Sequence, residues 1–221
     1  MTVIGINGSP RKKWNTAQLL TQALEGAASQ GAGTELVHLY DLDFRGCTSC
    51  FACKLIDGPS NGRCAMTDEL TPVLRRIEDD ADALLLATPV YFGSQSGEMR
   101  SFLERLLFAP LVYSDPPRTA FRRQLRTAMI YTMNAPEEAI VPMGYDALFR
   151  STEAVLARIL GESETLCSYD TYQFRDYSKV VMERMDPVQK AERREQVFPD
   201  DLGRAFELGR RIASAAPKDL D

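Results

Sequence analysis

The sequence predicts an α/β fold, in which a doubly wound parallel sheet of five strands carries helices on both faces. Strand-like segments alternate with helical segments five times along the chain, and a parallel sheet covered by helices is the simplest way to connect such units. Residues 82–88 are apolar enough to form a central strand. The chain of 221 residues is expected to form one domain, with a cysteine-bearing loop at residues 45–67 and a C-terminal extension at about residues 173–221.

Composition and charge exclude some classes of protein. The formal net charge of -5 argues against nucleic acid as the main partner. The longest obvious apolar run, residues 83–87, is far too short to cross a membrane and suits a buried strand. The chain starts directly with the strand-like residues 2–6 and shows no basic or apolar leader, so a cytoplasmic location is expected, where disulfides are rare.

In the first half of the chain, turn residues and an amphipathic helix follow each strand. The expected strands are apolar or alternating segments at residues 3–6, 34–40 and 82–88. The expected helices carry one apolar stripe each and cover residues 17–29, 67–78 and 97–108. Asn15 or Thr16 is expected to cap the first helix. The third strand is expected to stop at Pro89, because proline cannot continue the ladder of a central strand.

The second half continues this alternation with longer connections. Residues 109–124 are rich in proline and arginine and are expected to form a loop. The expected fourth and fifth strands cover residues 126–131 and 164–172, and the helix between them covers residues 146–160. Residues 174–197 are charged and are expected to be helical only in part, before a last helix from about Asp200 to Ala215.

The residues between the first strand and the first helix form a candidate anion site. Backbone amides at a helix start point outward, and the helix dipole is positive there. Arg11, Lys12 and Lys13 add positive charge, while other polar side chains offer hydrogen bonds, namely Ser9, Asn15 and Thr16. Neither a Gly-x-Gly-x-x-Gly nor a Walker pattern is present, so the loop suits a terminal monophosphate better than a pyrophosphate. The alternative is a basic surface turn before a helix.

A second candidate segment follows the third strand. Pro89-Val90-Tyr91-Phe92-Gly93-Ser94 could present backbone groups and aromatic rings to a flat ligand, although core aromatics at a strand exit are an equal alternative. The loop from Thr132 to Ala135, including Asn134, is expected to form a third wall. In the flavodoxin-like strand order these loops meet beyond the carboxyl ends of the strands, where ligands bind. A monophosphate at one end and a flat ring at the other describe flavin mononucleotide (FMN).

Four of the five cysteines lie close together in the sequence, at positions 47, 50, 53 and 64. Close, regular gaps allow one loop to place several sulfur atoms around an iron–sulfur cluster. Zinc, redox-active thiols, a disulfide and no metal at all remain alternatives. Cys167 lies in the expected fifth strand and is interpreted as an ordinary core thiol.

Several motifs together resemble those of the NADPH-dependent FMN reductase superfamily, and more closely those of its iron–sulfur flavoprotein branch. They are Gly8-Ser9-Pro10-Arg11, Asn15-Thr16, the cysteines Cys47, Cys50, Cys53 and Cys64, Asp68, and Pro89-Val90-Tyr91-Phe92-Gly93. The resemblance covers roughly residues 1–135, and the gap before Cys64 is longer than in the compact motif of that branch. It implies a flavodoxin-like fold, bound FMN, a homodimer or homotetramer, and a [4Fe-4S] cluster close to the flavin of the same or a neighbouring subunit.

The resemblance also implies residue roles. The FMN phosphate would be held by Ser9, Arg11, Asn15 and Thr16. The isoalloxazine ring would be lined by Pro89, Val90, Tyr91, Phe92 and Gly93, with Thr132 and Asn134 nearby. The cluster ligands would be Cys47, Cys50, Cys53 and Cys64. No side-chain acid or base is predicted, since His38 is the only histidine.

The sequence therefore predicts an FMN-dependent oxidoreductase that passes electrons between bound FMN and NAD(P)H, ferredoxin or a small-molecule substrate. A dedicated dehydrogenase in a biosynthetic pathway is one form of this prediction. One alternative is a flavodoxin-like electron carrier without its own substrate, and another is a cluster-free NAD(P)H:FMN or quinone reductase. A third is a zinc-stapled interaction protein that has lost its flavin. The expected partners are a small molecule or a ferredoxin-type protein.

Overall fold

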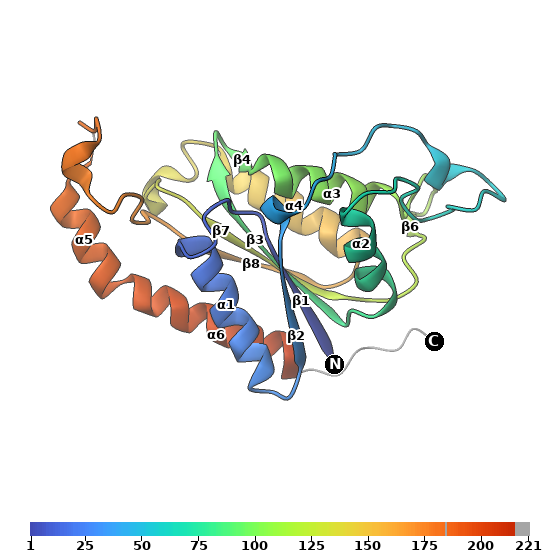
Figure 1. Ribbon diagram of the computed structural model, residues 1–221, viewed down its shortest axis with the longest axis horizontal. Coiled ribbons are helices and arrows are strands. Elements are labelled where there is room, and N and C mark those ends of the chain that lie inside the picture. Colours follow the sequence, from blue (N-terminus) through green and yellow to red (C-terminus); the bar gives the residue numbers. More distant parts are fainter. Residues whose placement is uncertain (184, 215–221) are drawn as a thin grey trace.

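A parallel sheet forms the centre of the molecule in the computed structural model, which describes residues 1–183 and 185–214 (Figure 1). Its strand order is β2-β1-β3-β7-β8. The strands are β1 (Thr2–Asn7), β2 (Gly33–His38), β3 (Ala83–Tyr91), β7 (Arg126–Thr132) and β8 (Ser163–Ser168). The short β4 (Ser94–Gln95) pairs with β3 in the antiparallel sense. This order confirms the predicted flavodoxin-like fold.

Helices cover both faces of the sheet (Figure 1). One face carries α1 (Asn15–Ala28) and α6 (Phe198–Ser214). The other carries α2 (Leu70–Asp79), α3 (Gly97–Phe108) and α4 (Tyr145–Ile159). Helix α5 (Pro187–Gln196) extends beyond the sheet at the end where β4 lies. Short 3-10 turns occupy Leu39–Asp41, Ala52–Lys54, Glu137–Ala139 and Tyr177–Lys179.

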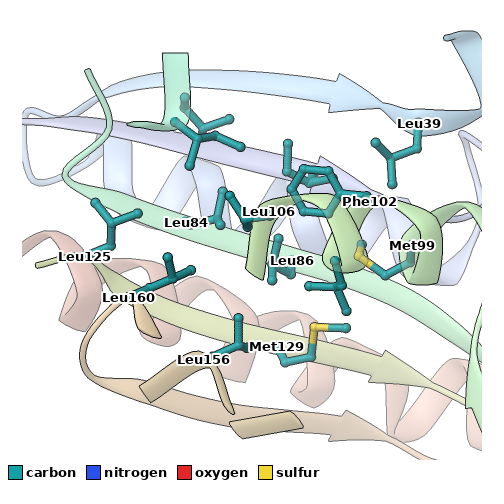
Figure 2. Packing of buried hydrophobic residues seen from close by; sticks show 14 of the residues in the cluster. Leu39, Leu84, Leu86, Met99, Phe102, Leu106, Leu125, Met129, Leu156 and Leu160 are labelled. Carbon is teal, nitrogen blue, oxygen red and sulfur yellow. The ribbon is translucent and has the colours of Figure 1, made fainter. Parts of the chain in front are cut away.

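Alternation along β3 divides the core into two layers. Leu84 and Leu86 point to the α3 side, where they pack with Phe102 in the cluster shown in Figure 2. Leu85 points to the opposite side, into the layer that includes Leu208 of α6. Successive side chains of a strand face opposite sides of a sheet, so a continuous apolar run is required when both faces are buried. The apolar sequence of residues 83–87 meets this requirement.

The third strand does not stop at Pro89, and this expectation was wrong. Strand β3 continues to Tyr91, and Pro89 pairs in register with Thr132 of β7. On its other side, β1 ends at Asn7, which pairs with Ala87. Beyond Ala87 the strand has a parallel neighbour on one side only. The N–H group that proline lacks is therefore not needed for hydrogen bonding to β1.

Other boundaries differ from the expected ones for local reasons. Strand β8 ends at Ser168 and not at residue 172, because Asp170 adopts a left-handed backbone conformation with φ of 49°. The loop at residues 109–124 contains a small hairpin, formed by β5 (Leu111–Val112) and β6 (Arg118–Thr119). The expected end of the last helix at Ala215 lies outside the described residues.

Close packing joins α1 to α6. A Cβ atom added to Gly209 would lie 1.7 Å from the carbonyl oxygen of Ala23, and one added to Gly26 would lie 2.0 Å from that of Phe206. Only glycine allows two helix backbones to approach this closely. The last helix is therefore fixed against the first, although nearly the whole chain separates them in sequence. Within the described residues, none of the helices has both the length and the apolar character needed to cross a membrane.

Candidate functional site

Gly8 brings the loop after β1 against the start of α3. A Cβ atom at this position would lie 2.7 Å from the Cβ of Met99. The N–H of Gly8 donates to the carbonyl of Ala87 at 2.8 Å, and the hydroxyl of Ser96 donates to the carbonyl of Gly8 at 2.5 Å. Ser96 also caps α3 by accepting from the N–H of Met99. The loops that follow β1 and β3 therefore meet at the carboxyl edge of the sheet, as predicted.

Polar side chains of the predicted phosphate site gather at the start of α1. Ser9, Asn15 and Thr16 are all buried. The hydroxyl of Ser9 accepts from the N–H of Arg11 at 3.2 Å. The hydroxyls of Thr16 and Thr132 lie 2.6 Å apart, which joins the start of α1 to the end of β7. The structure thus brings together residues from the first and the third predicted walls.

The expected cap of α1 by Asn15 or Thr16 was wrong. Trp14 occupies the position before the helix, and no side chain in the described part of the chain caps it. Thr16 bonds to Thr132, and Asn15 turns toward the C-terminal part of the chain. A helix start without a side-chain cap leaves backbone N–H groups for other partners, and an anion is the partner that these groups and the helix dipole favour.

The C-terminal extension covers this loop, which the sequence did not reveal. The carbonyl of Tyr172 accepts from Trp14 Nε1 at 3.0 Å and from Asn15 Nδ2 at 2.7 Å. The carbonyl of Gln173 accepts from Arg11 Nη1 at 2.6 Å. From α5, Arg194 donates to Asn15 Oδ1 at 2.9 Å. A phosphate bound at this loop would share or replace these carbonyl contacts.

Electrostatics also connect the first loop with the aromatic turn. Burial lowers the pKa of Arg11 from its ordinary value, and the nearby Tyr91 acts in the opposite direction. The guanidinium stays charged, because arginine is not deprotonated in proteins. It lies 3.9 Å from the centroid of the Trp14 ring. Arg11 therefore lies on the first loop within electrostatic reach of Tyr91 in the turn after β3.

The predicted aromatic turn is a tight hairpin between β3 and β4. Phe92 and Gly93 have φ values of 50° and 74°, in the left-handed region. Phe92 is fully exposed and Tyr91 is partly exposed, which excludes the alternative of core aromatics for these two rings. A Cβ atom at Gly93 would lie 3.2 Å from the Tyr145 ring. Pro89 lies at the last register position shared by β3 and β7.

A cavity of about 530 Å³ lies beside the ends of β3 and β7. This volume is within the range of small-molecule and cofactor sites. Residues from five segments contribute to its lining, among them Val90, Met133, Asn134, Tyr145, Asp170 and Lys190. Val90 and Asn134 are the two predicted ring-binding residues that line it.

Lys190 is a charged residue of this cavity that sequence reasoning missed. It is 3% exposed, and its ammonium group pairs with the Asp170 carboxylate. The same group donates to Asn134 Oδ1 at 2.6 Å, which orients the Asn134 carboxamide with its nitrogen on the opposite side. In the sequence, Lys190 is one cation in a charged stretch, so only tertiary structure could reveal it.

The four clustered cysteines line one small cavity of about 20 Å³, together with Arg105 of α3. Cys53 is buried, Cys50 is exposed, and Cys47 and Cys64 are intermediate. Burial raises the pKa of the Cys53 thiol, and the neighbouring Lys54 opposes this effect. All four are free thiols in the described structure. The residues at positions 54–63 therefore form an excursion that does not separate Cys64 from the other three.

The arrangement of these thiols bears on the kind of metal they could hold. In the part of the chain that the structure describes, no three His, Cys, Asp or Glu side chains group tightly enough for a single metal ion. A cubane cluster makes a different demand, because each cysteine binds a different iron atom. The four cysteine residues border one cavity, so the loop brings them to the same place. A cluster would be larger than this cavity, and binding one would require the loop to widen.

The backbone of the cysteine loop and the turn between β3 and β4 lie toward opposite ends of α3 (Figure 1). We call the candidate site at the carboxyl ends of β1, β3 and β7 the strand-end site. Ser96 begins this helix beside Gly8, whereas Arg105, Phe108 and Ala109 from its last turns line the cysteine cavity. The helix has 12 residues, which corresponds to a length of about 18 Å. Within one chain, the two candidate sites are therefore separated by most of a helix length.

The strand order, the uncapped helix start and the cavity at the strand ends define a flavodoxin-like α/β protein with a candidate ligand site at the carboxyl edge of its sheet. The sequence model of the family described as NADPH-dependent FMN reductase matches residues 1–135. The chain therefore belongs to this family, which confirms the resemblance found in its motifs.

Curated relatives include iron–sulfur flavoproteins of archaea. The chain is 36% identical over 105 residues to one from Methanocaldococcus jannaschii, which covers 48% of this chain and 51% of that protein. It is 34% identical over 107 residues to one from Archaeoglobus fulgidus, which covers 48% of this chain and 46% of that protein. The chain thus spans about half the length of the curated relatives it matches.

Solved structures share the fold across almost the whole chain. An NAD(P)H:quinone oxidoreductase from Methanothermobacter marburgensis has a TM-score of 0.71 at 16% identity and covers 96% of this chain and 98% of its own. An FMN-dependent NADH-azoreductase from Bacillus anthracis, solved in complex with FMN, has a TM-score of 0.62 at 13% identity. This match covers 96% of this chain and 100% of the azoreductase chain. At these identities the likeness concerns the fold alone.

Proposed function

We propose that this protein is an FMN-dependent oxidoreductase of the iron–sulfur flavoprotein type. The observation that carries the proposal is the contact between Thr16 and Thr132 at the uncapped start of α1, which follows the loop of the buried Ser9. These residues lie at the carboxyl edge of a flavodoxin-like sheet, in a chain whose first 135 residues match the FMN reductase family. FMN is also bound in one of the structures that share the fold.

In this proposal the first loop holds the FMN phosphate. Ser9, Asn15 and Thr16 supply side-chain hydrogen bonds, the first turn of α1 supplies backbone N–H groups, and Arg11 supplies positive charge. The carbonyls of Tyr172 and Gln173 give up their donors to the phosphate. The hydroxyl pair of Thr16 and Thr132 fixes the loop against β7. Among these groups, Arg11 is the one whose charge distinguishes FMN from uncharged riboflavin.

The isoalloxazine ring lies between the turn after β3 and the loop after β7. Pro89, Val90 and Gly93 supply the backbone surface, Tyr91 and Phe92 supply exposed rings at the rim, and Asn134 supplies an amide nitrogen to the cavity. Lys190 keeps that amide oriented, and its own charge is paired with Asp170. When bound, FMN accepts a hydride and releases electrons singly, and the protein's part is positioning and electrostatic tuning.

Cys47, Cys50, Cys53 and Cys64 are the proposed ligands of a [4Fe-4S] cluster. Their position around one cavity supports the proposal, as does their presence in a chain related to iron–sulfur flavoproteins. A cluster carries one electron at a time, so the pair of cofactors couples two-electron donors to one-electron partners. NAD(P)H, a ferredoxin-type protein or a small molecule would supply or receive the electrons.

Assembly of several copies completes the proposal. In one chain, the cysteine cavity and the strand-end site lie toward opposite ends of α3, which favours transfer between the cluster of one subunit and the flavin of a neighbour. A homodimer or homotetramer would bring such neighbouring subunits together.

Electron transfer to two kinds of acceptor tests the proposed function. Anaerobic protein with NADH or NADPH should reduce a quinone, which takes two electrons, and a ferredoxin, which takes one. Cys53→Ala should keep its flavin and its quinone reduction but lose most ferredoxin reduction, because the cluster ligand is gone. Cys167→Ala, which removes a buried thiol outside the cysteine cavity, is the matched control and should keep both. Failure of the wild type to transfer electrons to either acceptor from any donor, including reduced ferredoxin, would overturn the proposal.

A cluster-free NAD(P)H:quinone reductase is the second candidate. The observation in its favour is the fold shared with a quinone oxidoreductase over almost the whole chain. In this case Cys53→Ala would change neither activity, and iron would be absent from the purified wild type.

A further inference from the structure

Arg105 is a fully buried arginine at the cysteine cavity. It lies in the second half of α3, and its side chain reaches three different groups. Nε lies 3.3 Å from the sulfur of Cys64, and Nη1 donates to Asp68 Oδ2 at 2.5 Å and to the carbonyl of Arg45 at 3.2 Å. Nη2 is buried and has no hydrogen-bond partner among the described residues.

A purely structural role explains only part of this arrangement. The ion pair with Asp68 joins α3 to the residue whose side chain accepts from the N–H of Leu70 at the start of α2. That pair occupies Nη1 and neutralises the charge. It does not explain a second donor directed at a thiol sulfur, nor a third donor left unpaired in the interior. Unpaired buried donors are costly and rare, so a missing partner is expected close to Nη2.

The cavity beside Arg105 is where that partner would lie. Its lining includes Arg105 together with all four clustered cysteines, so a group held by those sulfur atoms would occupy the space next to the guanidinium. Hydrogen bonds to the sulfur atoms of an iron–sulfur cluster, and nearby positive charge, stabilise its reduced form and raise its reduction potential. The guanidinium of Arg105 offers the hydrogen bonds, whereas its charge is balanced by the paired carboxylate of Asp68.

We infer that Arg105 donates hydrogen bonds from Nε and Nη2 to sulfur atoms of the cluster and its ligand Cys64, and so raises the reduction potential of the cluster. The inference rests on the cluster part of the proposed function. Arg105 is a positioning and tuning residue here, because it acts on the cluster and not on a substrate. It sets how readily the cluster accepts an electron from the flavin.

A redox titration of the anaerobic holoprotein, followed by the electron paramagnetic resonance signal of the reduced cluster, tests this role. The variant Arg105→Lys keeps a cation beside Asp68 but removes the donors Nε and Nη2. At a fixed solution potential, we expect at least a tenfold lower ratio of reduced to oxidised cluster, which corresponds to about 59 mV for one electron. Flavin content should not change.

Arg75→Lys is the matched control. Arg75 also contacts Cys64, but its Nη2 donates to the backbone carbonyl at 2.9 Å, and its Nη1 pairs with Glu78. The potential of this variant should stay at the wild-type value. A second measurement covers the case in which Arg105→Lys loses its cluster. In wild-type protein labelled with ¹⁵N-arginine, the reduced cluster should show magnetic coupling to nitrogen, and Arg75→Lys should keep this coupling.

The outcomes separate the inference from the proposed function. Iron in the wild type, with an unchanged potential in Arg105→Lys, overturns the inference and leaves the proposed function standing. The absence of ¹⁵N coupling in an iron-loaded wild type does the same. A wild type that binds FMN but no iron after anaerobic reconstitution overturns the inference together with the cluster part of the proposed function.

Discussion

At the residue scale, Asn7 connects the only histidine to the candidate phosphate loop. Its Oδ1 accepts from the N–H of Ser9 at 3.0 Å, so its Nδ2 must be the group that lies 2.8 Å from Nδ1 of His38. Nδ1 of His38 therefore accepts this hydrogen bond and carries no proton. Protonation of Nδ1 would break the bond and release the side chain that holds Ser9.

This contact predicts a pH dependence of stability. Burial lowers the pKa of His38. Asp41 opposes this effect, and Lys12 adds to it. The unfolded chain then binds the proton more tightly than the folded one, so the contribution of His38 is full above a pH of about 6.5 and is lost as the pH falls toward the folded pKa. Urea unfolding between about pH 5 and pH 8 measures it. The difference in unfolding free energy between wild type and His38→Gln should shrink on acidification, and a constant difference would contradict the assignment.

Arg11 allows a test of the phosphate site itself. Arg11→Gln should weaken FMN binding by roughly 10-fold, because a charge-assisted hydrogen bond to the phosphate is lost. Riboflavin has no phosphate, so its affinity should not change. Quenching of flavin fluorescence on titration into apoprotein measures both. Lys13→Gln, which removes an exposed charge from the same loop, is the control and should have a much smaller effect. Equal losses for FMN and riboflavin would place the phosphate elsewhere.

At the element scale, the contact between α1 and α6 holds the C-terminal part of the chain in place. Gly209→Ala should destabilise the protein by about 2–3 kcal/mol, because its Cβ would overlap the carbonyl of Ala23 and force the helices apart. Gly203 lies in the same helix, and a Cβ atom added there would meet open space. Gly203→Ala should therefore be neutral or stabilise the protein by about 1 kcal/mol. Midpoints of urea unfolding measure both. Similar effects at the two positions would contradict the close packing.

Lys54 fastens the cysteine loop to the end of α3. Its ammonium group donates to the carbonyls of Phe108, Ala109 and Leu111, and it lies 4.5 Å from the centroid of the Phe108 ring. The carbonyls of Phe108 and Ala109 lie at the end of α3, where cations are favoured. The ammonium group thus joins residue 54 of the loop directly to the helix that carries Arg105.

Lys54→Met should release the loop without unfolding the sheet. We expect a loss of about 1–3 kcal/mol in stability, because charged hydrogen bonds are removed, and faster proteolytic cleavage within residues 45–67. Limited proteolysis with mass spectrometry locates the cleavage. Lys179→Met, which removes an exposed lysine far from this loop, is the control. Unchanged cleavage in Lys54→Met would show that other contacts hold the loop.

The elements that the sequence predicted are those whose signals are local. The apolar run of β3 and the stripe of α3 are periodic, and the bounds of α3 agree with the structure. The end of β3 was predicted wrongly at Pro89, because a proline is tolerated in this strand only beyond the last residue that pairs with β1. The residues around Pro89 do not show where β1 ends. The last helix was also predicted, and it begins two residues earlier, at Phe198, but its close contact with α1 depends on glycines that only the packed structure explains.

The candidate sites likewise contain residues that the sequence indicated and residues that only the structure revealed. Ser9, Asn15 and Thr16 lie close together in the sequence, so their pattern was visible there, although their roles stay predictions. Lys190 and Arg105 act through contacts with Asp170 and Cys64, which lie 20 or more residues away in the chain. Such partners are brought together only by the tertiary structure, and no signal in the sequence indicates them.

At the scale of the whole molecule, the two candidate sites lie in different parts of the fold. The carboxyl edge of the sheet carries the candidate flavin site, and the far end of α3 carries the cysteine cavity. Tyr172 and Arg194 both contact Asn15 of the first loop, so residues outside the family match at residues 1–135 cover part of the candidate site. The proposed coupling of flavin and cluster therefore depends on the complete fold.

The most direct test of this account is the ultraviolet–visible spectrum of anaerobically purified protein, with FMN, iron and zinc quantified on the same sample. We predict flavin bands with a broad brown shoulder, one FMN per chain and about four iron atoms per chain. Cys64→Ala should keep the flavin bands and lose the shoulder. Flavin without iron would contradict the cluster and leave a flavin reductase, whereas zinc without flavin would contradict the account as a whole.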